Sequence, residues 1–202
     1  MHIGIDFDNT IVTYDNLFHK YALQLGLIGK EVDKNKQVIR DTIRKLPNGN
    51  DKWTELQGLV YGKYMDEAEL MDGVSDFLKA CKKNGVKVSI VSHKTIFPAI
   101  GPKINLQDAA KKWFKDKGFI KMFGMKDEDI VFEESLSGKL SQIRSRKCTH
   151  FIDDLPEVLL HSDFPEGVIK ILYSKSKHLN SDDVKCLDSW QSINNYIFKG
   201  IS

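Results

Sequence analysis

The sequence has 202 residues, which is enough for one full domain with a smaller second one. Hydrophobic residues make up 41% and charged residues 29%, the composition of an ordinary soluble globular protein. A formal net charge of +2 gives no electrostatic reason to expect nucleic acid or an anionic membrane as a partner.

Two further features indicate the compartment. No apolar stretch reaches the roughly 18 residues of a membrane span, and the first residues lack the basic leader and long apolar core of a signal peptide. The three cysteines, Cys81, Cys148 and Cys186, are too far apart in sequence for a disulfide framework or a CxxC metal site. We therefore expect a cytoplasmic protein with no nucleic-acid or membrane partner. The residues leave its oligomeric state open.

The chain starts with a short apolar run, residues 3–5, that predicts a buried strand of a parallel sheet. The run ends in two carboxylates, Asp6 and Asp8, followed by Asn9 and Thr10. Open α/β sheets bind ligands just beyond the carboxyl ends of their strands, so these carboxylates are candidates for a site. Like charges this close repel each other, and a divalent cation commonly relieves the repulsion. The alternative is an ordinary turn, which Asp and Asn also favour.

The segment from about residue 15 to 70 contains no predicted strand. Apolar residues at helical spacing predict a first helix within 11–27, and a second pattern of this kind runs through 30–45. After a clear break at 47–50, an aromatic-rich helix is predicted over 51–64. We therefore expect an all-helical insertion in this part of the chain.

The alternation of helices and strands resumes after residue 70. A helix that begins near Gly73 ends at Asn84-Gly85, and a strand over 86–91 leads directly into Ser92 and His93. A serine hydroxyl with backbone amides around it suits a phosphoryl oxygen. The alternative is a serine that caps the next helix.

A predicted helix over 108–118 and a short strand over 130–132 come next. The helix after that strand opens with Lys139. A lysine in a first turn opposes the helix dipole, which indicates a role other than helix stability. The alternative is a solvated surface lysine, the commonest fate of this residue type.

Another short strand, over 150–152, ends in Asp153 and Asp154 and is followed by a helix that starts at Leu155-Pro156. These aspartates form a second acidic strand end, although they could also be an N-cap. A strand over 168–173 and a closing helix over 190–197 complete the chain. About five strands that alternate with helices predict an α/β fold, with a parallel sheet and helices on both faces.

These motifs resemble those of a known family. Residues 6–10, with the sequence DFDNT, match the DxDxT signature of the haloacid dehalogenase-like (HAD) superfamily of phosphohydrolases. Ser92 resembles the second motif of that family, Lys139 the third, and Asp153-Asp154 the fourth. Their order and their places at strand ends agree over roughly the whole chain.

The resemblance implies an organisation into two domains. A Rossmann-like core domain, 1–14 and 71–202, would carry the motifs, and a helical cap domain, 15–70, would be inserted between the first and second of them. The sequence leaves open which of Lys94, Lys139 and Lys147 is the lysine that neutralises the phosphate.

The resemblance also implies roles for the site residues. Asp6 is the expected nucleophile that forms an aspartyl-phosphate, and Asp8 is the expected acid–base group. Mg²⁺ is the expected cofactor, because it prefers oxygen ligands. Its expected ligands, which include the backbone carbonyl of Asp8, are Asp6, Asp8, Asp153 and Asp154. The expected phosphate-binding residues are Ser92, His93 and Lys139.

The expected function is that of a magnesium-dependent phosphatase that hydrolyses a small phosphorylated metabolite. Haloalkanoate dehalogenases of this superfamily lack the second aspartate, so Asp8 favours phosphoryl chemistry. The basic residues His93 and Lys94 favour an anionic substrate, either a sugar phosphate or a nucleotide. One alternative is a phosphotransferase or phosphomutase that uses the same intermediate. The other is a non-catalytic phospho-regulator, which the order of the motifs disfavours.

Overall fold

The computed structural model describes residues 1–174 and 183–199. The chain divides into two compact units. The core unit consists of Met1–Val12, Leu70–His93 and Gly118–Ser202, and the helical unit consists of Thr13–Glu69 and Lys94–Lys117. Every residue that the sequence analysis placed in a catalytic, phosphate-binding or metal site lies in the core unit.

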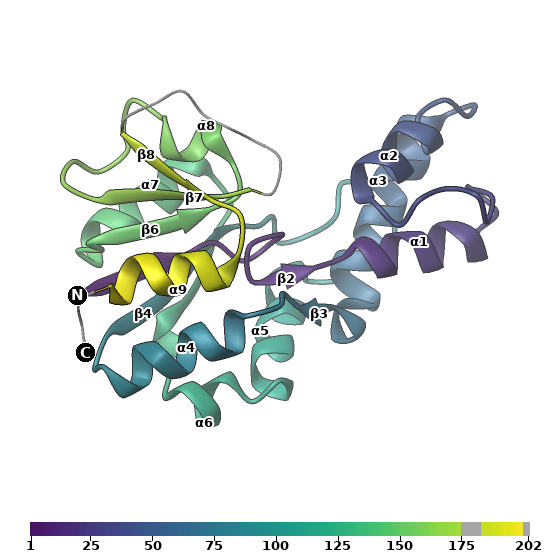
Figure 1. Ribbon diagram of the computed structural model, residues 1–202. Helices are drawn as coiled ribbons and strands as arrows, with labels where there is room; N and C mark the ends of the chain where they lie inside the picture. Colours follow the sequence, from purple (N-terminus) through teal and green to yellow (C-terminus); the bar gives the residue numbers. More distant parts are fainter. Residues whose placement is uncertain (175–182, 200–202) are drawn as a thin grey trace. The chain divides into compact units, whose positions relative to one another are not determined.

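The core unit contains a six-stranded sheet in which every neighbouring pair of strands is parallel (Figure 1). The strand order is β5-β4-β1-β6-β7-β8. The strands are β1 (His2–Ile5), β4 (Lys87–His93), β5 (Ile130–Glu133), β6 (His150–Asp153), β7 (Ile169–Tyr173) and β8 (Val184–Leu187). The predicted Rossmann-like α/β fold is therefore confirmed, but the count of about five strands was one short because β8 was missed.

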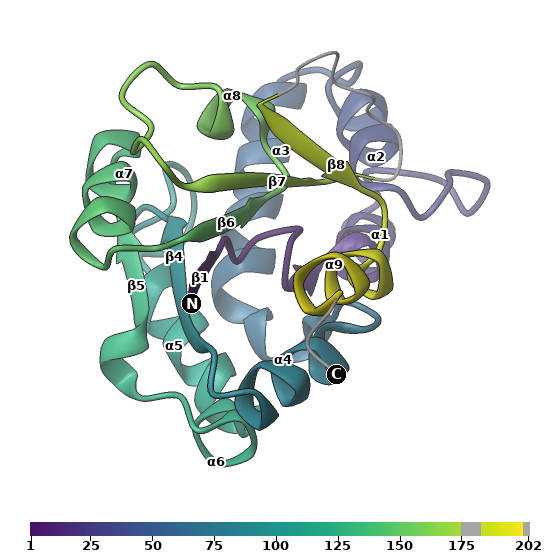
Figure 2. The same ribbon diagram turned by 60° about the vertical axis from the view of Figure 1, so that its left-hand side comes forward.

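Helices cover both faces of the sheet, as Figure 2 shows. On one face, α7 (Leu136–Ser145) and α8 (Pro156–Leu159) pack on the sheet through a cluster that includes Val91, Phe151 and Leu172. On the other face lie α4 (Val74–Lys83) and α9 (Trp190–Phe198), whose contact is made by Phe77 and Trp190. The short helix α6 (Phe119–Phe123) also belongs to this unit.

The register of the strands decides where the polar motifs meet. Ile5, the last residue of β1, pairs with Ile90 of β4 and with Ile152 of β6. Asp6 comes directly after Ile5, and Asp153 comes directly after Ile152. Ser92 comes two residues after Ile90. Three segments that are distant in sequence therefore bring their polar side chains to the same, carboxyl-terminal edge of the sheet.

The helical unit is built around aromatic side chains. Its helices are α1 (Asp15–Gln24), α2 (Lys36–Ile43), α3 (Gly49–Gly58), a π-helical turn (Leu59–Lys63), a 3₁₀ turn (Met65–Glu67) and α5 (Leu106–Asp116). Phe18 stacks on Trp53 with 4.8 Å between ring centroids, and the indole N–H of Trp113 donates to the Ala68 carbonyl. These contacts tie three separate stretches of chain into one core.

The helical unit differs in detail from the predicted insertion. It includes residues 94–117, which the sequence analysis had placed in the core domain, so the predicted cap boundaries of 15–70 do not coincide with it. The predicted first helix starts only at Asp15, because Val12–Thr13 form the short strand β2. This strand pairs with β3 (Glu69–Leu70), so the end of the expected all-helical stretch is a strand. That this segment acts as a cap stays a prediction.

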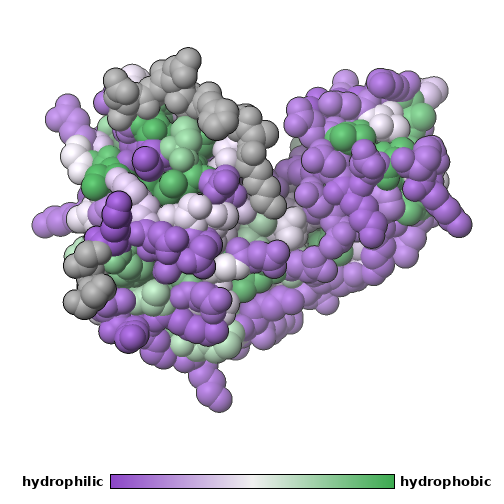
Figure 3. All heavy atoms as spheres, in the orientation of Figure 1, coloured by the Kyte–Doolittle hydropathy of each residue, from purple (hydrophilic) through white to green (hydrophobic). Residues whose placement is uncertain are grey.

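One hollow on the surface of the core unit lies away from the polar strand ends. Figure 3 shows hydrophobic atoms, in green, over β7 and β8 among hydrophilic ones. An open depression of about 430 Å³ is lined there by Val168, Ile169, Val184 and Tyr196. It lies where β7 and β8 begin, at the edge of the sheet opposite Asp6 and Asp153.

Among the described residues, no helix has both the length and the apolar character needed to cross a bilayer.

His2 lies at the start of β1, and its imidazole is buried at the base of the sheet. Its Nδ1 is 2.7 Å from the Arg146 carbonyl oxygen, and its Nε2 is 2.9 Å from Ser89 Oγ. Burial lowers the pKa of His2 below 6.5, against the opposing effect of the hydrogen bond to the Arg146 carbonyl. The folded protein therefore favours the neutral ring.

This burial makes the free energy of unfolding pH-dependent. A histidine whose pKa is lowered by folding takes up its proton more readily in the unfolded chain. The contribution of His2 to stability is therefore complete above pH 6.5 and is lost as the pH falls below that value. We expect His2→Gln to show a smaller drop in melting temperature between pH 8 and pH 5 than the wild type, by calorimetry at both pH values. An equal drop in the two proteins would contradict this assignment.

Candidate active site

The loop after β1 is shaped by the backbone around Phe7. The amide of Asp6 still donates to the Ile152 carbonyl at 2.8 Å, which continues the pairing of β1 with β6. The chain then turns, and the amides of Ile11 and Val12 both donate to the Phe7 carbonyl, at 3.0 and 3.2 Å. Asn9 has a φ of 60°, a left-handed conformation that asparagine tolerates better than most residues. Because the Phe7 ring is fully buried, the loop is anchored directly behind Asp6.

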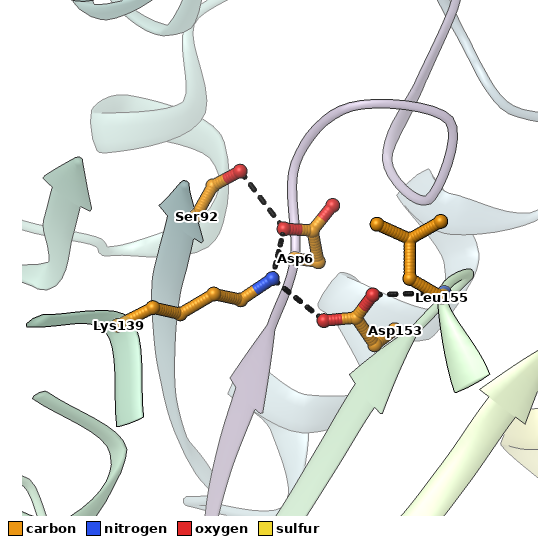
Figure 4. A network of polar contacts seen from close by, with 5 residues as sticks. All are labelled: Asp6, Ser92, Lys139, Asp153 and Leu155. Carbon is orange, nitrogen blue, oxygen red and sulfur yellow. Dashed lines mark hydrogen bonds and ion pairs between the residues drawn. The ribbon is translucent and has the colours of Figure 1, made fainter. Parts of the chain in front are cut away.

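Four side chains meet at the carboxyl-terminal edge of the sheet (Figure 4). Asp6 Oδ1 accepts hydrogen bonds from Ser92 Oγ at 2.8 Å and from Lys139 Nζ at 2.6 Å. The same ammonium lies 2.6 Å from Asp153 Oδ2. The other oxygen of Asp153 accepts from the Leu155 amide at 3.0 Å. Lys139 therefore bridges two carboxylates that come from different strands.

The second oxygen of Asp6 is oriented differently from the first. Both side-chain contacts to Asp6 use Oδ1, and Figure 4 shows the other oxygen pointing away from Ser92 and Lys139. The Asp6 carboxylate is thus held through one oxygen, and its orientation is fixed by two donors from two other elements. An oxygen of a fixed carboxylate that is free to meet a ligand is the geometry that nucleophilic catalysis requires.

The charges of this cluster are almost completely buried. Burial alone would lower the pKa of Lys139, but the negative charges of Asp6 and Asp153 outweigh burial and raise it above its ordinary value. Burial and the nearby Asp6 raise the pKa of Asp153 to about 7, against the opposing effect of Lys139. The Lys139 ammonium is thus paired with two carboxylates, Asp6 and Asp153, which leaves the cluster with an excess of negative charge.

A third carboxylate adjoins this network. Oxygens of Asp6, Asp153 and Asp154 lie within 4.8 Å of one another, and Asp154 is only half buried. Carboxylate oxygens in this number are a ligand set that suits Mg²⁺, which takes hard oxygen ligands and retains some water. The three side chains therefore fit a divalent cation, both in donor chemistry and in the excess of negative charge.

The remaining predicted site residues are placed differently. Asp8 is half buried and forms an isolated bridge with Val12, and its carboxylate is not part of the group of three around Asp6. His93 is exposed, and its Nε2 lies 2.9 Å from the Glu134 carbonyl oxygen. The structure thus brings Ser92 and Lys139 to Asp6 but turns the imidazole of His93 toward the loop after β5.

Of the three lysines that the sequence left open, Lys139 is the one that contacts Asp6 and Asp153. Lys147 is exposed and occupies a left-handed turn with φ 53° after α7. Lys94 belongs to the helical unit, where its ammonium lies 4.9 Å from the centroid of the Tyr61 ring.

The alternatives based on helix capping do not hold. Ser92 lies within β4, and the next helix, α5, is capped by the side chain of Asn105. Asp153 ends β6, and the N-cap position of α8 is Leu155, with no side-chain cap. Sequence reasoning missed the amide of Leu155 as a partner of Asp153. The signal for it was present, because an aspartate in a turn commonly accepts from the backbone amide two residues further on.

Comparison with known proteins identifies the fold of the chain. No protein-family model and no curated protein matches the sequence. Solved structures do match over almost the whole chain. A HAD-superfamily hydrolase from Ehrlichia chaffeensis has 16% identity and a TM-score of 0.58, and the match covers 100% of this chain and 97% of that one. The chain has the haloacid dehalogenase-like fold.

Two further HAD-fold structures hold ligands. A HAD family hydrolase from Deinococcus radiodurans, with bound phosphate and sodium, has 13% identity and a TM-score of 0.60 over 98% of this chain and 95% of that one. A putative HAD-hydrolase from Bacillus subtilis, bound to magnesium, has 12% identity and a TM-score of 0.60 over 97% of each chain. At such low identity the likeness establishes the HAD-like fold and not the activity.

Proposed function

We propose that this HAD-like chain is a magnesium-dependent phosphatase that hydrolyses a small phosphorylated metabolite through an aspartyl-phosphate on Asp6. The observation that supports the proposal most directly is the contact of Asp6 with both Ser92 and Lys139, beside Asp153 and Asp154. A held carboxylate, two donors and a set of cation ligands are what phosphoryl transfer to a protein side chain needs.

The first chemical step would form a bond between Asp6 and the phosphorus of the substrate. The oxygen that points away from Ser92 and Lys139 is the proposed attacking atom, since Oδ1 already accepts from both donors. As that bond forms, the bond from phosphorus to the leaving oxygen breaks. Asp8, two residues further on, is the proposed acid that gives its proton to the leaving oxygen.

The second step would return Asp6 to its starting state. Asp8, now deprotonated, would take a proton from a water molecule, whose oxygen attacks the phosphorus while the bond to Asp6 breaks. Ser92, His93 and Lys139 are the proposed partners of the phosphoryl oxygens in both steps. For His93 this requires its ring to leave the Glu134 carbonyl, with which it is in contact here.

A magnesium ion fits the acidic side of the site, with Asp6, Asp153, Asp154 and the backbone carbonyl of Asp8 as its proposed ligands. When bound, it would neutralise phosphate oxygens that otherwise repel an anionic nucleophile. A HAD-fold structure described with magnesium and another described with phosphate support these assignments.

The proposed substrate is a sugar phosphate or a nucleotide monophosphate.

The proposed compartment is a reducing one such as the cytoplasm. All three cysteines are free thiols. Burial raises the pKa of Cys81 to about 12 and that of Cys148 to about 11, so both are poor nucleophiles at neutral pH. The thiols of these two residues therefore do not compete with Asp6 as candidate nucleophiles.

A screen of phosphorylated metabolites, in magnesium and in chelator, tests the proposal. We expect release of inorganic phosphate from at least one monoester in the presence of magnesium, its loss on chelation, and its return when magnesium is restored. Phosphate that appears on an added alcohol instead of in solution would identify a phosphotransferase. If no ester is turned over under any of these conditions, the proposed function is wrong.

A further inference from the structure

Lys139 occupies an unfavourable place in its helix. It is the fourth residue of α7, which begins at Leu136 and is capped by Ser135, whose Oγ accepts from the Gly138 amide at 3.0 Å. The N-terminal turn of a helix carries a partial positive charge, so a lysine there is disfavoured. A negatively charged side chain beside this turn would offset that cost.

Glu133, the last residue of β5, lies against that turn. Its Oε1 accepts from Gln142 Nε2 of α7 at 2.7 Å. A Cβ placed on Gly138 would lie 2.8 Å from Oε2 of Glu133 and 3.2 Å from its Cβ. The carboxylate thus covers the residue directly before Lys139, so closely that a Cβ there would displace it. A negative charge there also offsets the positive charge of the turn and of the lysine.

Glu133 is itself fixed to the strand that carries Ser92. In the sheet, Ser92 pairs with Phe132 and His93 pairs with Glu133. The contact between His93 Nε2 and the Glu134 carbonyl adds a second tie between β4 and the loop after β5. Glu133 therefore connects a rigid strand pair to the helix that presents Lys139.

We infer that Glu133, through Gln142 and Gly138, is a positioning residue that keeps Lys139 bridged between Asp6 and Asp153. This inference rests on the proposed function. Both contacts of the ammonium are 2.6 Å, so a small displacement of α7 would lengthen one or both of them. A misplacement of about 1 Å in a catalytic site can cost about 10²-fold in rate. The expected defect is thus in kcat, because the side chain of Glu133 contacts Gln142 and Gly138 of α7 and acts on the site through the position of Lys139.

The test uses steady-state kinetics with magnesium and a phosphomonoester that the wild type hydrolyses. Glu133→Ala should lower kcat by about 10- to 100-fold with KM within about threefold of wild type. Glu133→Gln, which can still accept from Gln142, should recover part of the loss. Gly138→Ala, which pushes against the carboxylate, should also lower kcat, and adding it to Glu133→Ala should cause a smaller further loss, because the shortest of its contacts, the one with Oε2 of Glu133, is then absent. Glu128→Ala, before the opposite end of β5, is the matched control and should keep wild-type kinetics.

Gln142→Ala provides an independent measurement if Glu133→Ala does not fold, and it should lower kcat in the same direction by several-fold. A wild-type kcat for both Glu133→Ala and Gln142→Ala, in an active enzyme, would overturn the inference. So would a matching loss in Glu128→Ala. A wild-type protein that hydrolyses no phosphomonoester would instead refute the proposed function, so the two failures are distinguishable.

Discussion

Asp6→Asn is expected to abolish phosphate release, with a loss of at least about 10⁴-fold in kcat. The amide that replaces the carboxylate is a poor nucleophile, and it also removes the charge that Lys139 and Ser92 hold in place. The variant should remain folded, because an asparagine at this position keeps the volume and can still accept hydrogen bonds from both partners. Single-turnover kinetics with a good substrate, together with thermal unfolding, would measure both effects.

Asp8→Asn distinguishes the proposed role of Asp8 from that of Asp6. The variant leaves the proposed nucleophile Asp6 intact, so phosphorylated protein should still form. Either the formation of the aspartyl-phosphate or its hydrolysis should be slower by about 10²-fold or more. The covalent phosphate can be detected by mass spectrometry after an acid quench. Turnover that survives in Asp6→Asn would rule out the nucleophile assignment, and wild-type rates in Asp8→Asn would rule out the acid–base role.

Lys139→Met is expected to destabilise the protein by about 3–5 kcal/mol as well as to inactivate it. The Lys139 side chain is only 1% exposed, and its ammonium pairs with two buried carboxylates, so its removal leaves both without their compensating charge. A divalent cation that binds the same carboxylates replaces part of that charge. Magnesium should therefore raise the melting temperature of the variant more than that of the wild type.

Lys147→Met is the matched control for this variant. Lys147 is exposed in the turn after α7, and we expect both its unfolding free energy and its activity to stay near wild type. Chemical denaturation of the three proteins, with and without magnesium, gives the free energies to compare. A Lys139→Met protein within about 1 kcal/mol of wild type would contradict the buried bridge as a stabilising element.

The predictions from sequence succeeded where short-range pattern and topology agree. Apolar runs at residues 3–5, 86–91 and 150–152 predicted three buried strands, and all three lie side by side in the parallel sheet. In a parallel sheet the carboxyl ends of the strands share one edge, so their polar ends had to meet. The convergence of Asp6, Ser92 and Asp153 followed from this rule without any knowledge of side-chain contacts.

The predictions failed where local pattern carries little information. Strand β8 reads Val-Lys-Cys-Leu, a short edge strand that follows a polar stretch, and its stability comes from pairing with β7. Residues 94–117 contain one helix that sequence pattern predicted well, but no local signal shows that it packs with residues 13–69 rather than with the sheet. His93 has the expected place at the end of β4, where its Nε2 is in contact with the Glu134 carbonyl, and its part in phosphate binding stays a prediction.

The parallel α/β architecture and the acidic edge at which a site would form could be predicted from the sequence, because both depend on hydrophobic periodicity and on where strands end. The lysine that contacts the carboxylates at that edge became evident from the packed fold. Lys94, Lys139 and Lys147 are equivalent as residue types. Exposure sets Lys147 apart, whereas Lys94 and Lys139 are both buried and differ in the partners that other segments supply. Lys139 is buried between Asp6, which is 133 positions away in the chain, and Asp153, which is 14 positions away. Long-range charge pairing of this kind has no periodicity in the sequence and appears only when the elements are packed.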